Sequence, residues 1–211
     1  MTTVKRGKKL KIYEIVSVGI FAALMVVFSQ ISVPMPFSPV PLTLSLFAVY
    51  LSSAVLGLKL GVLVQAVYLL LGIAGFPVFS GFNGGFGHLF GPTGGYLLSY
   101  PVMAALIGSF SDRIPISRFK TPAAGKKSFL LMLSYTIVFT VALAVCYLLG
   151  SLRLSYVLSI PLSAGLLAGA LPYIPLDILK IAICTLIVLP VKRRYLSIAA
   201  IPRPADRTGE V

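Results

Sequence analysis

Six long apolar runs, separated by short segments rich in glycine, proline or charge, dominate the pattern along the chain. Each run approaches the ~20 residues that a helix needs to cross ~30 Å of hydrocarbon. The pattern therefore predicts an all-α integral membrane protein, folded as one domain over residues 1–211. The predicted transmembrane helices lie near 12–33, 42–58, 60–75, 93–110, 129–149 and 162–190.

Glycine and proline interrupt two of the apolar stretches. Residues 42–74 form a continuous run interrupted only by Gly57-Leu-Lys-Leu-Gly61. One helix of that length would reach about 50 Å, so we expect a tight turn near Lys59. The last run is broken by Pro172 and Pro175. No internal repeat is visible in the sequence, which does not favour an inverted-repeat transporter.

Composition supports a membrane protein, because 58% of the 211 residues are apolar and only 11% are charged. Soluble domains carry about 25% charged residues. The net charge is +13, from 18 Lys and Arg against 5 Asp and Glu. Such a balance can indicate nucleic-acid binding, but here the basic residues lie between apolar runs. We expect the partner of this charge to be a lipid bilayer, not a nucleic acid.

The basic residues also predict an orientation. If the loops alternate between the two sides of the membrane, sixteen Lys and Arg residues fall on one side, Arg153 lies alone on the other, and Lys180 lies within the last run. The side with more basic residues is normally cytoplasmic. We therefore expect both termini in the cytoplasm, including the basic segments 1–11 and 191–211, with 12–33 retained as a membrane helix and not cleaved as a signal peptide.

Asp177 and Lys180 are the ionisable residues that the pattern places at membrane depth, with Glu14 at the cytoplasmic start of the first helix. A spacing of three puts Asp177 and Lys180 on one face of a helix that starts near Pro175. Intramembrane charges are costly and usually functional, so Lys180 is a candidate cation for an anionic ligand. In a purely structural alternative, Asp177 complements the helix N-terminus and Lys180 pairs with it or snorkels outward.

A glycine-rich segment lies between the third and fourth predicted helices, at residues 75–96, and is too irregular for a helix. Non-helical backbone at membrane depth must be buried in protein or line a cavity. We expect this segment to form an extracellular lid over the same cavity that receives Asp177 and Lys180. Its phenylalanines could wrap an apolar ligand, and a structural plug is the alternative.

Other chemistry has little support in the sequence. The single histidine, His88, suits a loop hydrogen bond better than catalysis and cannot alone hold a metal. Cys146 and Cys184 lack the spacing of a zinc site or a disulfide framework. No Walker A motif is present. An intramembrane hydrolase with a Ser/Lys dyad on Lys180 is the weaker hypothesis, since no G-x-S-x-G turn accompanies it.

Four ordered motifs resemble one family, the biotin-specific substrate-binding subunits (BioY) of energy-coupling-factor transporters. They are Pro39-Val-Pro-Leu-Thr-Leu44, Gly75-Phe-Pro-Val-Phe79, Gly91-Pro-Thr-Gly-Gly-Tyr-Leu97 and Pro175-Leu-Asp-Ile-Leu-Lys180. The resemblance implies a six-helix protein of the prokaryotic plasma membrane that captures biotin with high affinity from outside and delivers it to the cytoplasm. It also implies that this chain is not an enzyme and needs no cofactor, because a transmembrane coupling subunit and two ABC-type ATPases hydrolyse ATP.

By motif, the resemblance assigns biotin contacts to Asn83, Asp177 and Lys180. Their chemistry suits biotin: a lysine can bind its carboxylate, and a carboxylate and an amide can bind its ureido group. Orientation of Lys180 is the alternative role for Asp177. Further candidates for the site are Thr43, Ser45 and Tyr96, with Ser45 standing where the family usually has glutamine. The small-residue stripe Gly19-x-x-x-Ala23 is the candidate docking site for the coupling subunit.

Overall fold

The structure, a computed structural model, describes residues 11–36, 38–114 and 126–199 and is mostly helical. Most of the predicted basic N-terminus and the end of the predicted tail lie outside these residues. The described elements are α1 (Ile12–Gln30), β1 (Ser32–Met35), β2 (Ser38–Thr43), α2 (Ser45–Ile73), α3 (Gly87–Phe90), α4 (Gly94–Arg113), α6 (Lys126–Leu158), α7 (Leu162–Gly169), the 3-10 turn η1 (Leu171–Tyr173) and α8 (Ile174–Ala199).

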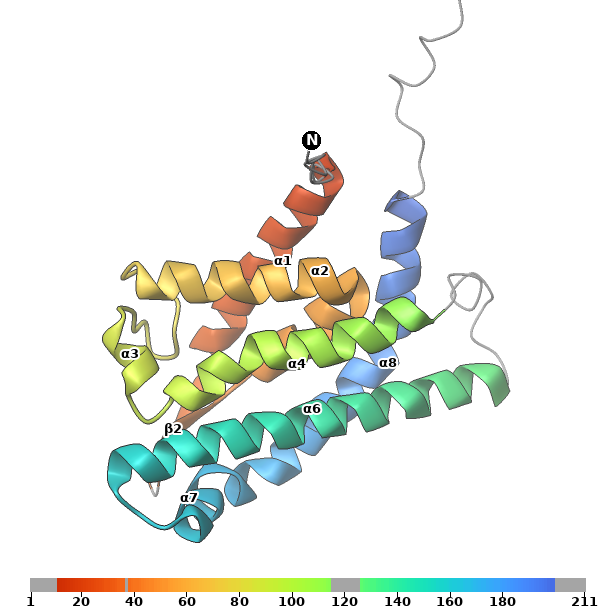
Figure 1. Ribbon diagram of the computed structural model, residues 1–211. Helices are drawn as coiled ribbons and strands as arrows, with labels where there is room; N and C mark the ends of the chain where they lie inside the picture. The colour runs from red at the N-terminus through yellow and green to blue at the C-terminus, as the bar shows by residue number, and fades with distance from the viewer. Residues whose placement is uncertain (1–10, 37, 115–125, 200–211) are drawn as a thin grey trace, which may run out of the picture.

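The long helices pack around one apolar core, with α4 lying between α2 and α6 and with α1 and α8 against α2 (Figure 1). Met25, Tyr68, Met103, Phe139 and Cys184 contribute to this core from five different helices. The outer faces carry large exposed apolar side chains on every one of these helices. A surface of this kind is stable in hydrocarbon and not in water, as expected for a membrane protein.

Four helical stretches of the described chain are long and apolar enough to cross a membrane: Ile12–Gln30, Ser45–Ile73, Ser128–Leu158 and Leu162–Ile198. The second of these is two helices in one, because its backbone leaves helical geometry at Gly57. Counting both halves and adding α4 gives an arrangement consistent with the predicted six helices.

A β-hairpin connects α1 to α2, and the sequence patterns did not predict it. The strands pair antiparallel, with Ser32 opposite Thr43 and Val33 opposite Leu42. Consequently α1 ends at Gln30, earlier than the expected residue 33, and α2 begins at Ser45 instead of residue 42. The cause is local: proline disfavours helical geometry in the residue before it, and four prolines lie between 34 and 41.

The break in α2 lies at Gly57, two residues before the expected turn at Lys59. Gly57 has φ +81° and ψ −172°, a conformation that only glycine adopts at low cost. Three side chains bind the backbone groups freed by the break, and one of them, Ser111, donates its hydroxyl to the Ala54 carbonyl at 2.6 Å. The Leu58 N–H donates to Asp112 Oδ2 at 2.9 Å, and Lys192 Nζ donates to the Ala54 carbonyl at 3.0 Å. Asp112 and Lys192 therefore cap the two halves of α2.

Gly57→Ala is expected to lower the stability of the protein by about 1–3 kcal/mol, the usual cost of forcing a residue with a Cβ into such a conformation. The added Cβ would also lie 2.0 Å from Asp112 Oδ1 and displace that cap. Thermal unfolding in detergent measures the loss. Gly19→Ala is the matched control, because its Cβ meets no atom within 4 Å, and an equal loss in both variants would contradict this account.

The last two long helices extend beyond their expected bounds. α6 continues from the expected end at 149 to Leu158, and Gly150, inside the helix, packs against the ring of Tyr96. α8 continues through Pro190 to Ala199, so the first part of the expected tail is helical. The break at Pro172 and Pro175 is present as the 3-10 turn between α7 and α8.

Candidate ligand-binding site

A cavity of about 670 Å³ lies between the β-hairpin, the glycine-rich segment, and the start of α4. This volume falls within the range of about 300–1,000 Å³ that is typical of small-molecule sites. Its walls are largely aromatic and aliphatic, with a few hydroxyl and amide groups. Helices α1 and α2 also contribute to the lining, which includes Ser29, Met35, Val40, Thr43, Ser45, Tyr68, Phe79, Asn83, His88, Thr93, Tyr96 and Tyr100.

A second, narrower pocket of about 50 Å³ adjoins this cavity and contains the buried charges. Asp177, Lys180, Tyr147 and Cys146 line the narrow pocket. The two hollows share the lining residues Val40, Pro41, Thr43, Tyr96 and Tyr100. Strand β2 and the first turns of α4 therefore connect a roomy, mainly apolar cavity to a small charged one.

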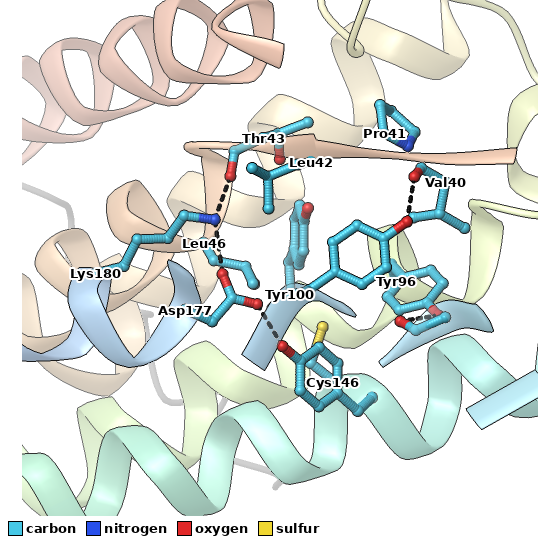
Figure 2. A pocket seen from close by; sticks show the side chains of 13 residues that line it. Val40, Pro41, Leu42, Thr43, Leu46, Tyr96, Tyr100, Cys146, Asp177 and Lys180 are labelled. Carbon is cyan, nitrogen blue, oxygen red and sulfur yellow. Dashed lines mark hydrogen bonds and ion pairs between the residues drawn. The ribbon is translucent and has the colours of Figure 1, made fainter. Parts of the chain in front are cut away.

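Asp177 and Lys180 form a buried ion pair, with Lys180 Nζ 2.6 Å from Asp177 Oδ1 (Figure 2). The same ammonium donates to the carbonyl oxygen of Thr43 at 2.6 Å, which ties α8 to strand β2. Only 2% of Asp177 and 6% of Lys180 is exposed. Pairing is what makes burial of two charges tolerable at this depth. An ammonium has three N–H donors, and two of those on Lys180 are engaged in this way.

The second carboxylate oxygen of Asp177 is bonded too. Tyr147, on α6, donates its hydroxyl to Asp177 Oδ2 at 2.5 Å. Asp177 is thus held between a cation on one side and a hydroxyl on the other. Sequence analysis missed Tyr147, because a tyrosine in an apolar helical run resembles an ordinary core residue and lies 30 positions from its partner.

The remaining site candidates are distributed around both hollows. The hydroxyls of Thr43 and Ser45 lie 2.5 Å apart, and Ser45 Oγ lies 2.9 Å from the hydroxyl of Tyr100. The ring of Tyr96 lines both hollows, while its hydroxyl donates to the Gly169 carbonyl at 2.7 Å. Asn83 lines only the larger cavity, and its Nδ2 donates to the Ser80 carbonyl at 2.8 Å.

Among the phenylalanines of the glycine-rich segment, Phe79 differs from the others. Its side chain is buried, lines the cavity and meets the ring of His88 edge-on at 6.1 Å. It also packs against Gly72, where a Cβ would lie 2.0 Å from its ring. The side chains at 76, 82, 86 and 90 are exposed. One of the five phenylalanines therefore contributes to the cavity wall.

The geometry gives little support to hydrolytic chemistry. In the described part of the chain, the hydrogen bonds of Lys180 go to a carboxylate and a backbone carbonyl, and none goes to a serine hydroxyl. Residues 11–36, 38–114 and 126–199 contain no cluster of three or more His, Cys, Asp or Glu that could hold a metal ion. The arrangement suits binding of a small molecule that carries an anionic group.

The fold and these hollows define a multi-pass membrane protein with a cavity of small-molecule size beside a buried ion pair. The BioY family model matches residues 3–197, and the chain belongs to the BioY family. This family comprises transporter components and not enzymes, which confirms the expectation that the chain is no enzyme.

Relatives match this chain over most of their length. The "Biotin transporter BioY" of Thermotoga maritima is 36% identical over 180 residues, which cover 85% of this chain and 96% of the relative. The "Probable biotin transporter BioY" of Pyrococcus horikoshii is 37% identical over 178 residues, covering 84% and 95% respectively. A crystal structure of the S-component for biotin from an ECF-type ABC transporter shares the fold, with a TM-score of 0.76, 24% identity, and coverage of 86% of this chain and 92% of that one.

Proposed function

We propose that this chain is the biotin-binding subunit of an energy-coupling-factor transporter, which captures biotin with high affinity and delivers it to the cytoplasm. The observation that carries the proposal is the buried Asp177–Lys180 pair beside a cavity of about 670 Å³. Biotin combines a carboxylate, an apolar thioether ring with an aliphatic tail, and a polar ureido group. The site offers a buried cation in its narrow pocket, and apolar walls with amide and hydroxyl groups in the larger cavity.

The contacts of Asp177 support a particular division of roles. Both of its carboxylate oxygens already accept hydrogen bonds, from Lys180 and from Tyr147. Asp177 therefore serves to orient Lys180, and Lys180 binds the biotin carboxylate with its remaining donor. The ureido group then lies in the larger cavity, near Asn83, with Tyr96 between the two ends. The hydroxyls of Thr43 and Ser45 lie nearer the carboxylate end, because the Thr43 carbonyl accepts from Lys180.

Energy for transport comes from partner proteins in this proposal. A transmembrane coupling subunit docks on α1, and two ABC-type ATPases hydrolyse ATP, in the plasma membrane of a prokaryote. The excess of basic residues supports an orientation with the termini in the cytoplasm and the glycine-rich segment outside, where we propose that it acts as a lid. Gly19 and Ala23 lie on the exposed face of α1, while Val18, Ala22 and Met25 face the core.

Gly19→Leu or Ala23→Leu is expected to abolish biotin uptake by cells while leaving biotin binding unchanged. A bulky side chain on this exposed face would keep a partner helix from approaching closely, without touching the cavity. Uptake of radiolabelled biotin, compared with binding to the purified variant, separates the two effects. Val141→Leu, on the exposed face of α6 and away from this stripe, is the control for added bulk alone. Equal loss of uptake and binding would indicate misfolding instead of lost docking.

The function itself is tested by equilibrium binding of biotin to the purified chain, with a biotin amide and desthiobiotin as competitors. We expect nanomolar binding of biotin and a large loss with the amide, which lacks the charge that Lys180 pairs with. Desthiobiotin, which keeps the carboxylate and the ureido group, should compete well. A folded protein that binds none of the three would contradict the proposed function.

A further inference from the structure

The C-terminal end of α1 is bonded to the backbone of the glycine-rich segment through two consecutive residues. Ser29, which is buried, donates its hydroxyl to the Val78 carbonyl at 2.5 Å. Gln30 uses both ends of its amide: Nε2 donates to the Phe79 carbonyl at 3.1 Å, and Oε1 accepts from the Phe82 N–H at 2.8 Å. One side chain therefore bridges the two sides of a tight turn.

This turn needs support because its backbone is strained. Phe82 has φ +58° and the preceding Gly81 has φ +72°. A positive φ is uncommon for a phenylalanine and persists only where the surroundings hold it. Within the turn, the Phe79 N–H donates to the Asn83 carbonyl at 2.9 Å. The Gln30 amide supplies hydrogen bonds to this turn from another element. Phe82 is 73% exposed, so packing of its side chain adds little support.

The turn also forms part of the cavity wall. Phe79, Ser80, Gly81 and Asn83 all line the larger cavity, whereas Gln30 does not. Any change in the path of this turn must move Asn83 and the ring of Phe79 relative to a ligand. Gln30 is thus placed to act on the site through the turn, without contact with the ligand.

We propose that Gln30 is a positioning residue, which fixes the 79–83 turn and with it Asn83 over the bound ligand and so slows ligand release. The ligand in this inference is biotin, so this part rests on the proposed function. The Gln30 clamp, by which we mean the hydrogen bonds from the Gln30 amide to Phe79 and Phe82, does not depend on that function, since these bonds exist in the protein without a ligand. Because α1 also carries Gly19 and Ala23, the same helix connects the proposed docking face to the cavity wall.

The test compares Gln30→Met with Gln65→Met. Methionine keeps the length of glutamine but removes its hydrogen bonds. Gln65 is a buried glutamine of α2 that bonds to Ser52 and lines neither hollow, so it controls for the substitution itself. In Gln30→Met we expect biotin to dissociate about tenfold faster, since two hydrogen bonds to the turn are lost. Gln65→Met should change the rate less than about twofold.

A spin label on the turn tests the clamp without biotin. The label is attached at Phe82→Cys, an exposed position, while the native Cys146 and Cys184 are buried. Gln30→Met should increase the mobility of this label, and Gln65→Met should leave it unchanged. Unchanged mobility and an unchanged dissociation rate in Gln30→Met would overturn the inference. Increased mobility in a protein that never binds biotin would support the clamp and contradict the proposed function.

Discussion

Lys180→Ala is expected to weaken biotin binding by about 3–5 kcal/mol, which raises the dissociation constant more than a hundredfold. The variant removes the cation proposed to pair with the biotin carboxylate and leaves that anion in a pocket with little access to water. Lys180 is 6% exposed and its charge is held in place by Asp177 and the Thr43 carbonyl. Isothermal titration calorimetry of the purified variant, or competition with labelled biotin, measures the change.

Two controls distinguish lost binding from lost folding. Lys192→Met removes a lysine that is similarly buried, at 5% exposure, but lies at the other end of α8 and lines neither hollow. It should lower thermal stability while preserving biotin affinity. The biotin amide is the second control, because Lys180→Ala should bind biotin and the amide almost equally. A loss of biotin affinity below about 0.5 kcal/mol would show that Lys180 is structural.

Asp177→Asn is expected to destabilise the protein by about 3–5 kcal/mol and to weaken biotin binding as well, because it leaves the Lys180 charge buried without a carboxylate. The amide oxygen of asparagine could accept from either Lys180 or Tyr147, but a neutral amide could not balance the positive charge of Lys180. The midpoint of thermal unfolding and the affinity for biotin should therefore fall together.

The double variant Asp177→Asn/Lys180→Met separates these effects. Removing both partners of a buried pair is far less costly than removing one. We expect the double variant to recover most of the thermal stability lost in Asp177→Asn, yet to bind biotin no better than Lys180→Ala. Recovery of binding together with stability would contradict a direct role for Lys180 in ligand recognition.

Local patterns in the sequence were sufficient to predict the helical membrane fold and the placement of Asp177 and Lys180 on one helix face, whereas their pairing was only one of the alternatives. Hydrophobic runs of membrane length reflect a one-dimensional constraint, since each helix must satisfy its own backbone in hydrocarbon. A spacing of three on one helix likewise places two side chains together without reference to any other element. Both features could be derived from neighbouring residues alone.

At two places where the sequence patterns gave different bounds, the structure shows contacts from distant elements. Tyr96 packs on Gly150 inside α6, and the break in α2 at Gly57 is capped by Asp112 and Lys192 from two other helices. The prolines between α1 and α2 disfavour a helix there. The β-hairpin itself is formed by hydrogen bonding between strands β1 and β2.

The sequence by itself determined the class of protein, the approximate helices and the residues that carry charge within the membrane. The tertiary structure decided which distant groups complete the site: Tyr147 on Asp177, the Thr43 carbonyl on Lys180, and Gln30 on the turn that holds Asn83. The residues joined by these contacts are 30, 137 and 52 positions apart, respectively. Hydrogen bonds of this kind depend on how whole helices pack, and no local periodicity encodes them.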